Sequence, residues 1–87
     1  MPVEVVPVVR DQIREFVIEN LMMGLDAEQL DDAKSLMDLG ILDSVGVLDL
    51  VGFLEATWQI VIADEELVSG NLDSIDNLVG FVGRKVA

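Results

Sequence analysis

The amino-acid sequence predicts an all-α fold of four helices, three of them long and one short. Apolar residues recur at helical spacing in three stretches, 7–21, 45–58 and 75–86, as expected of helices that bury one face. An Asp-Ser pair precedes two of these stretches, and such residues favour helix starts. The β-branched segment 59–62 cannot build a sheet alone. At 87 residues, we expect one domain over 1–87 with one modest core.

The first helix is predicted to begin near Pro7, because proline is favoured in the first turn of a helix. Its apolar residues have the spacing of one face: Val9, Ile13, Phe16, Val17 and Leu21. Gly24 is predicted to follow the helix end, where glycine readily takes the left-handed conformation.

Residues 25–41 predict a long first loop that includes at most one short helical turn, because periodicity is weak and acids are frequent. Leu30, Leu36 and Leu39 are predicted to pack this loop against the helices. Loops of this length are uncommon in compact domains and are often functional.

The second helix is predicted to begin at Ser44 and to end near Trp58. Its apolar residues predict a broad buried stripe of Val45, Leu48, Val51, Leu54 and Trp58, with Val47, Leu50 and Phe53 beside it. Phe53 and Trp58 are therefore assigned to the core. Because helical neighbours are three or four residues apart, Val45, Asp49 and Gly52 form a side that can face a partner.

The remaining chain predicts an extended link over 59–62, one short helix over 64–68 that ends in a turn at 69–71, and a last helix from Ile75. Ser74 is predicted to cap this last helix. Basic residues in its last turn complement the helix dipole: Arg84 and Lys85.

The chain contains neither cysteine nor histidine, so the commonest nucleophile-base pairs and most transition-metal sites are excluded. The acidic segment 64–76 lacks the ligand spacing of a calcium loop. We therefore expect a protein that is not an enzyme and binds no metal.

Charge is concentrated in residues 26–76, which hold 13 acids against Lys34 and account for the net charge of −12. Such a surface repels nucleic acid and anionic lipid and attracts basic protein surfaces. No apolar run reaches the roughly 20 residues that span a bilayer, and residues 1–5 lack the basic start of a signal peptide. We expect a cytoplasmic protein that does not insert into membranes.

The segment 38–45, Asp-Leu-Gly-Ile-Leu-Asp-Ser-Val, predicts a loop that presents Ser44 at a helix start. Two roles for Ser44 are open on chemistry alone. Its hydroxyl can cap the helix, or it can carry a negatively charged group that the positive end of the helix dipole tolerates. The same pattern recurs as Leu72-Asp73-Ser74-Ile75, so an Asp-Ser pair by itself does not separate the two roles.

Asp38-Leu39-Gly40, Asp43-Ser44-Val45, Leu48-Asp49-Leu50-Val51 and Leu54-Glu55 together resemble the acyl carrier protein family, and similar residues continue to Val82. The resemblance covers about residues 32–82 and implies an acyl-carrier-like four-helix bundle. It further implies that Ser44 carries 4′-phosphopantetheine, whose thiol holds the cargo as a thioester, and that Asp43 and Val45 help to place the serine. As an alternative to a core role alone, the resemblance leaves open that an acyl group enters beside Phe53 and Trp58.

The resemblance also implies partners: a phosphopantetheinyl transferase, an acyl or aminoacyl ligase or acyltransferase, and a downstream synthase of fatty-acid, polyketide or nonribosomal-peptide type. Acids that would steer these enzymes are Asp49, Glu55, Glu65 and Glu66. Such carriers are usually monomers. The segment 40–46 is similar to D-alanyl carrier proteins, which favours an activated amino acid or a short acyl group as cargo. The competing hypothesis is an unmodified acidic helical adaptor that binds a basic protein partner.

Overall fold

The computed structural model describes residues 5–22, 26, 28 and 30–86. Within them the chain forms α1 (Val5–Phe16), a π-helical continuation (Val17–Leu21), α2 (Ser44–Trp58), a 3₁₀ turn (Asp64–Glu66), α3 (Ser69–Leu72) and α4 (Ile75–Val86). The described residues contain no strand, so the predicted all-α fold, with three long helices and one short one, is confirmed.

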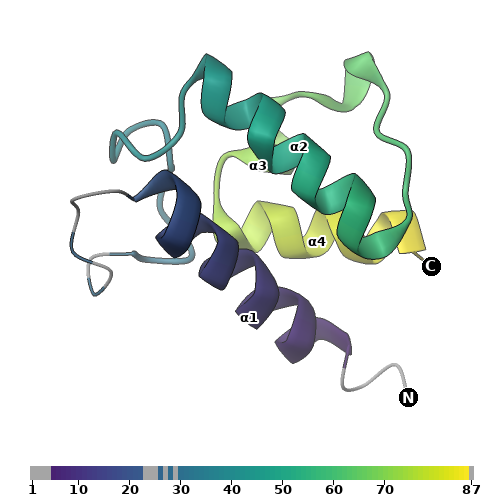
Figure 1. Ribbon diagram of the computed structural model, residues 1–87, viewed down its shortest axis with the longest axis horizontal. Coiled ribbons are helices and arrows are strands. Elements are labelled where there is room, and N and C mark those ends of the chain that lie inside the picture. The colour runs from purple at the N-terminus through teal and green to yellow at the C-terminus, as the bar shows by residue number, and fades with distance from the viewer. Residues whose placement is uncertain (1–4, 23–25, 27, 29, 87) are drawn as a thin grey trace.

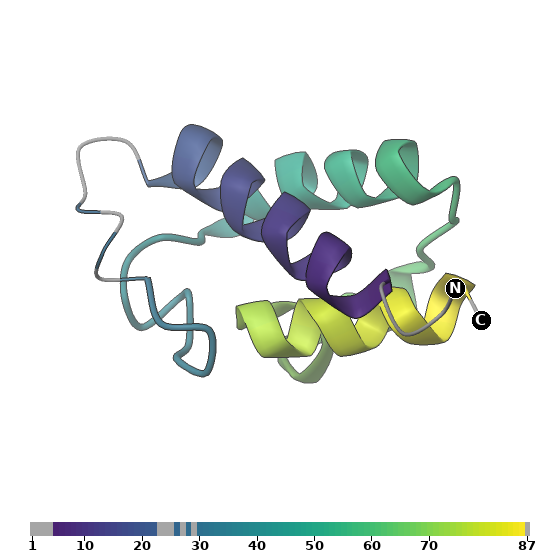
Figure 2. The same cartoon turned by 90° about the horizontal axis from the view of Figure 1, so that it is seen from below.

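Helix α4 is the centre of the packing, because it contacts α1, α2 and α3. Figure 1 shows α1 running obliquely past α2 and α4. In the turned view of Figure 2, α2 and α4 lie on opposite sides and α1 crosses from one level to the other. The core lies between these helices and is built from aliphatic side chains and one phenylalanine, including Val9, Ile13, Val17, Leu50, Leu54, Ile75, Leu78, Phe81 and Val82. Burial of each such side chain contributes about 1.5–3 kcal/mol.

The predicted apolar face of the first helix is confirmed at Val9, Ile13 and Val17, which are buried. The helix widens at its end, where the Met22 N–H donates to the Val17 carbonyl at 3.0 Å. The predicted helix-ending Gly24 lies outside the described residues. No helix among the described residues combines the length and apolar character needed to cross a bilayer.

The predicted buried stripe of the second helix is wrong at two positions. Val45 is 70% exposed and Leu48 is 69% exposed. The buried line is Gly46, Leu50 and Leu54, of which Leu54 belongs to the predicted stripe and Leu50 was placed beside it. Because α2 is apolar on all sides, a rotation of 100° per residue exchanges one plausible face for another, and periodicity could not choose between them.

Gly46 explains the choice of face in part. A Cβ atom at this position would lie 3.3 Å from Asp43 Oδ1, 3.4 Å from Leu42 Cδ1 and 3.5 Å from Leu21 Cδ2. The bare backbone of α2 therefore packs directly against the end of the first helical stretch and the loop. This close approach turns Val45 and Leu48 away from the core.

The predicted short helix is displaced. One 3₁₀ turn occupies Asp64–Glu66, and the short α-helix α3 lies at Ser69–Leu72, where a turn was expected. The Glu66 carboxylate accepts a hydrogen bond from the Ala63 N–H at 2.9 Å and closes the first turn. The chain then leaves helical geometry at Leu67, and burial of Leu72 draws the next turn onto the core. In the link before these turns, Ile60 and Ile62 are buried and Val61 is exposed, as in extended backbone.

The first loop is anchored as predicted by Leu30 and Leu36, which are buried. Leu39 is not an anchor, because it is 37% exposed. Its neighbour Gly40 has a φ of 74° and reverses the chain there, so Ile41 and Leu42 enter the core instead.

Ion pairs hold the beginning of this loop against the helices. Asp32 pairs with Arg10 at 2.7 Å and also with Arg14, both on α1. Arg10 in turn reaches Asp76 on α4, again at 2.7 Å. The Asp76 N–H donates to the Asp32 carbonyl at 3.0 Å. Loop, α1 and α4 are thus joined at one place.

Candidate functional site

Ser44 is the first residue of α2, and its side chain is exposed. The helix is capped by the residue before it. Asp43 has extended backbone geometry, and its carboxylate accepts a hydrogen bond from the Gly46 N–H at 2.7 Å. Among the described residues no hydrogen bond involves Ser44 Oγ. Capping, one of the two roles that Ser44 could have, is therefore carried out by Asp43.

The surroundings of Ser44 suit a negatively charged substituent. The first N–H groups of a helix have no partner within the helix, and together with the dipole they favour an anion at this end. The Asp43 carboxylate binds one of these groups, the Gly46 N–H, and the first turn of α2 itself contains no acidic residue. A phosphate ester on the Ser44 hydroxyl fits such a position.

The exposed side of α2 next to Ser44 combines apolar and acidic side chains. Val45 and Leu48 are the most exposed large apolar residues of this helix, and Asp49 is exposed beside them. A Cβ atom at Gly52 would meet no other atom within 4 Å, so the helix backbone is open there. This is the side on which Val45, Asp49 and Gly52 were predicted to cluster.

The four acids predicted to meet partners have two kinds of surroundings. Asp49 and Glu65 are exposed. Glu55 is half-buried, and its Oε2 accepts a hydrogen bond from the Ile62 N–H at 2.8 Å, which holds the link after α2. Glu66 accepts from Ala63 N–H and, at 3.0 Å, from Lys85 Nζ. The Ala63 N–H and then the Lys85 ammonium lower the pKa of Glu66.

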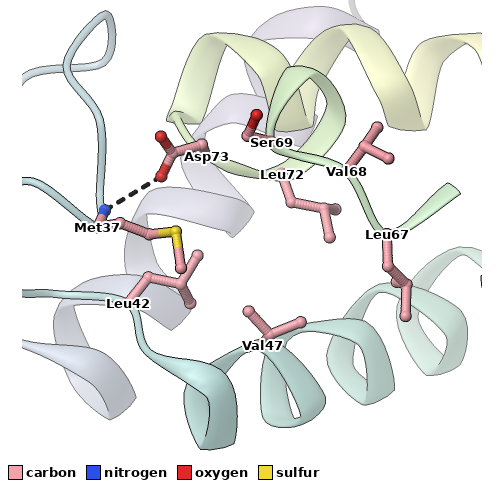
Figure 3. A pocket seen from close by; sticks show the side chains of 8 residues that line it. All are labelled: Met37, Leu42, Val47, Leu67, Val68, Ser69, Leu72 and Asp73. Carbon is pink, nitrogen blue, oxygen red and sulfur yellow. Dashed lines mark hydrogen bonds between the residues drawn. The ribbon is translucent and has the colours of Figure 1, made fainter.

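A cavity lies between the first loop, α2 and the segment that includes α3 (Figure 3). It encloses about 130 Å³ and is lined mainly by apolar side chains: Met37, Leu42, Val47, Leu67, Val68, Ser69, Leu72 and Asp73. Val47 lies one helical turn from Ser44. One wall of the cavity therefore lies close to the serine along α2.

Sequence reasoning did not identify this cavity and considered the region of Phe53 and Trp58 instead. Phe53 stacks on Phe16 with ring centroids 4.3 Å apart, and Trp58 packs edge-on against Phe53 at 5.7 Å. All three rings are half-buried against the core. None of them lines this cavity, but Phe16 and Phe53 line a second cavity of about 230 Å³ between the first helical stretch and α2. The walls of the cavity come from three distant segments, so no local pattern in the sequence could have indicated it.

Comparison with known proteins identifies the family. No curated protein matches the chain significantly. The family model described as "Phosphopantetheine attachment site" matches residues 11–82, well over half of the chain. This match begins within α1 and extends further toward the N-terminus than the resemblance found from motifs. The chain therefore belongs to the phosphopantetheine-attachment family of carrier domains, and it is a site of 4′-phosphopantetheine attachment.

Proposed function

We propose that this chain is an acyl or aminoacyl carrier protein in which Ser44 Oγ bears the 4′-phosphopantetheine. The observation that carries this assignment is the exposed Ser44 hydroxyl at the first position of α2, beside an Asp43 that already caps the helix. A phosphopantetheinyl transferase would esterify this hydroxyl through the phosphate of coenzyme A. The thiol that the group supplies would hold the cargo as a thioester.

The contribution of the protein is positional, since carrier domains of this family are not themselves catalytic. Tethering a cargo to a docked carrier makes its encounter with the active site intramolecular and raises its effective concentration. Asp43 fixes the start of α2, and Val45 presents an apolar surface directly beside the serine. These two residues would place the prosthetic group relative to a partner enzyme.

Partner enzymes would dock on the exposed side of α2. Val45 and Leu48 offer apolar contact there, and the exposed carboxylates of Asp49 and Glu65 would steer basic surfaces. Glu55 and Glu66 would contribute charge while also holding the link and the 3₁₀ turn. Charge pairs at a solvated rim suit partners that must bind fast and leave fast.

The dimensions of the cavity support a small cargo. Pockets for drug-sized ligands measure about 300–1,000 Å³, whereas the cavity beside Ser44 encloses about 130 Å³. We therefore propose an activated amino acid or a short acyl group as cargo, loaded by an adenylating ligase or an acyltransferase. The proposal treats residues 1–87 as one monomeric carrier domain that works with cytoplasmic enzymes. The competing adaptor hypothesis is not favoured, because the family match concerns attachment of a prosthetic group.

The test is the intact mass of the purified protein after incubation with coenzyme A and a broad-specificity phosphopantetheinyl transferase. Ser74→Ala is the matched control, because Ser74 lies in the other Asp-Ser pair. We expect one phosphopantetheine increment on the wild type and on Ser74→Ala and none on Ser44→Ala. A folded wild-type protein that gains no mass would contradict the proposal and would favour the adaptor hypothesis instead.

A further inference from the structure

Asp73, at the junction between α3 and α4, binds the first loop. Three consecutive loop residues bind it. The Leu36 N–H donates to the Asp73 backbone carbonyl at 2.6 Å. The Met37 N–H donates to Asp73 Oδ1 at 3.1 Å, and the Ser35 hydroxyl donates to Asp73 Oδ2 at 2.5 Å. Figure 3 shows the bond from Met37 to Asp73 at one edge of the cavity.

The connection continues from Leu36 to the end of the loop. The side chain of Leu36 is fully buried, and its carbonyl accepts hydrogen bonds from the N–H groups of Ile41 at 2.9 Å and Leu42 at 3.1 Å. Leu42 is buried and directly precedes Asp43, the cap of α2. A continuous set of hydrogen bonds therefore runs from Asp73 to the residue before the cap.

We propose that Asp73 is a positioning residue for the modification of Ser44. Through Ser35, Leu36 and Met37 it holds the loop in the conformation in which Ser44 is presented to the transferase. This role rests on the proposed carrier function. It adds a residue that lies far from Ser44 in the sequence and whose side-chain hydrogen bonds go to Ser35 and Met37 of the first loop.

The expected signature of this role is kinetic. If the loop samples several conformations, only a fraction of the molecules is competent to bind the transferase, and the apparent affinity falls by that fraction. Chemistry in the bound complex is unchanged once the loop is in place. Loss of Asp73 should therefore raise KM for the carrier and leave kcat nearly unchanged, whereas a purely structural role would change stability alone.

Ser74 provides the matched control, because it lies at the same junction and its side-chain hydrogen bonds go to Asn77 on α4 and not to the loop. Its Oγ accepts from the Asn77 N–H at 3.0 Å and so caps α4. The variants to compare are Asp73→Ala, Asp73→Asn and Ser74→Ala. Asparagine keeps an acceptor for the Met37 N–H and a polar partner for Ser35, so it should restore part of the effect.

The experiment measures transfer of phosphopantetheine from coenzyme A over a range of carrier concentrations, with intact mass as the readout. We expect Asp73→Ala to raise KM about tenfold with kcat within about twofold. Ser74→Ala should leave both constants near the wild-type values, and Asp73→Asn should be intermediate. Equal KM values for Asp73→Ala and Ser74→Ala would overturn the assignment.

Amide hydrogen exchange separates this test from that of the carrier function. In Asp73→Ala the amides of Met37, Ile41 and Leu42 should exchange faster than in the wild type, and in Ser74→Ala they should not. A wild-type protein that gains no phosphopantetheine would refute the carrier function. If the exchange rates of these loop amides were the same in Asp73→Ala as in the wild type, the proposal that Asp73 holds the loop would be refuted. If Asp73→Ala does not fold, Ser35→Ala, which removes one of the two side-chain bonds, takes its place with the same expectations.

Discussion

The two Asp-Ser pairs of this chain, Asp43-Ser44 and Asp73-Ser74, share a sequence pattern and divide their work in opposite ways. In the first pair the aspartate caps α2, and the serine is the exposed first residue of the helix. In the second pair the serine is buried and caps α4, and the aspartate binds the first loop. Helix α2 begins at the serine of its pair, whereas α4 begins at Ile75, one residue after the serine of its pair. That shift decides which side chain remains available for chemistry.

The cause of the difference lies in the residue that follows each serine. Ile75 is fully buried in the core, whereas Val45 is 70% exposed. Burial of Ile75 fixes the rotation of α4, and close packing at Gly46 fixes that of α2. A local motif therefore acquires its role from tertiary packing, and an identical pair of residues can serve structure in one place and presentation in another.

The largest expected difference in stability is between the truncation of Ile75 and the truncation of Val45. Ile75→Ala should lower the free energy of unfolding by about 2–5 kcal/mol, because it leaves a cavity in the core. Val45→Ala should change it by less than about 0.5 kcal/mol, as is usual for exposed positions. Urea denaturation of both variants measures the difference. Similar losses at the two positions would mean that Val45 packs in the core and that α2 is rotated from its position here.

Removal of the caps should give intermediate effects. Asp43→Ala and Ser74→Ala should each cost about 1 kcal/mol, because each leaves an N–H group in the first turn of a helix without its partner. Ser44→Ala should cost less than about 0.5 kcal/mol. These changes are again measured by urea denaturation. If Ser44→Ala were as destabilising as Asp43→Ala, the serine would share in capping and the comparison of the two pairs would fail.

The smallest expected effect is the loss of stability when a single acid after α2 is neutralised. It should distinguish Glu66, which binds other parts of the fold, from Glu65, which is exposed. The pKa of Glu66 is below its ordinary value of 4.5, owing to the Ala63 N–H and to Lys85. Its ionised form therefore contributes stability above about pH 4.5, and this contribution is lost as the pH falls through the lower pKa of the folded state. The stability gap between the wild type and Glu66→Gln should close over that range. Glu65→Gln, at the exposed neighbour, is the matched control and should change the free energy of unfolding at neutral pH by less than about 0.5 kcal/mol.

Much of the fold could be predicted because it is periodic. Val9, Ile13 and Val17 mark the buried face of the first helix four residues at a time, and Ser44 and Ser74 mark the beginnings of the next long helices. The face of α2 could not be predicted in the same way, since nearly every side of this helix is apolar. Only the packing at Gly46 shows that Leu50 and Leu54 point inward.

The site was predicted in its local part and missed in its long-range part. The segment before Ser44 indicated a presented serine from sequence alone. The cavity and the bonds of Asp73 to Ser35 and Met37 join segments that lie 36 to 38 residues apart in the chain. Neither the periodicity nor the residue spacing of a sequence indicates contacts between such distant segments. The internal partners of Glu55 and Glu66 were missed for the same reason, because they depend on how the link after α2 folds back.

The most direct test of the account is to locate the phosphopantetheine within the modified protein. The chain contains four serines, Ser35, Ser44, Ser69 and Ser74, so fragments produced by cleavage at acidic residues can be assigned by mass spectrometry. We predict that the added group lies on the fragment that contains Ser44 and that the other three serines are unmodified. The group on Ser74, or on any other serine, would contradict the division of roles between the two Asp-Ser pairs.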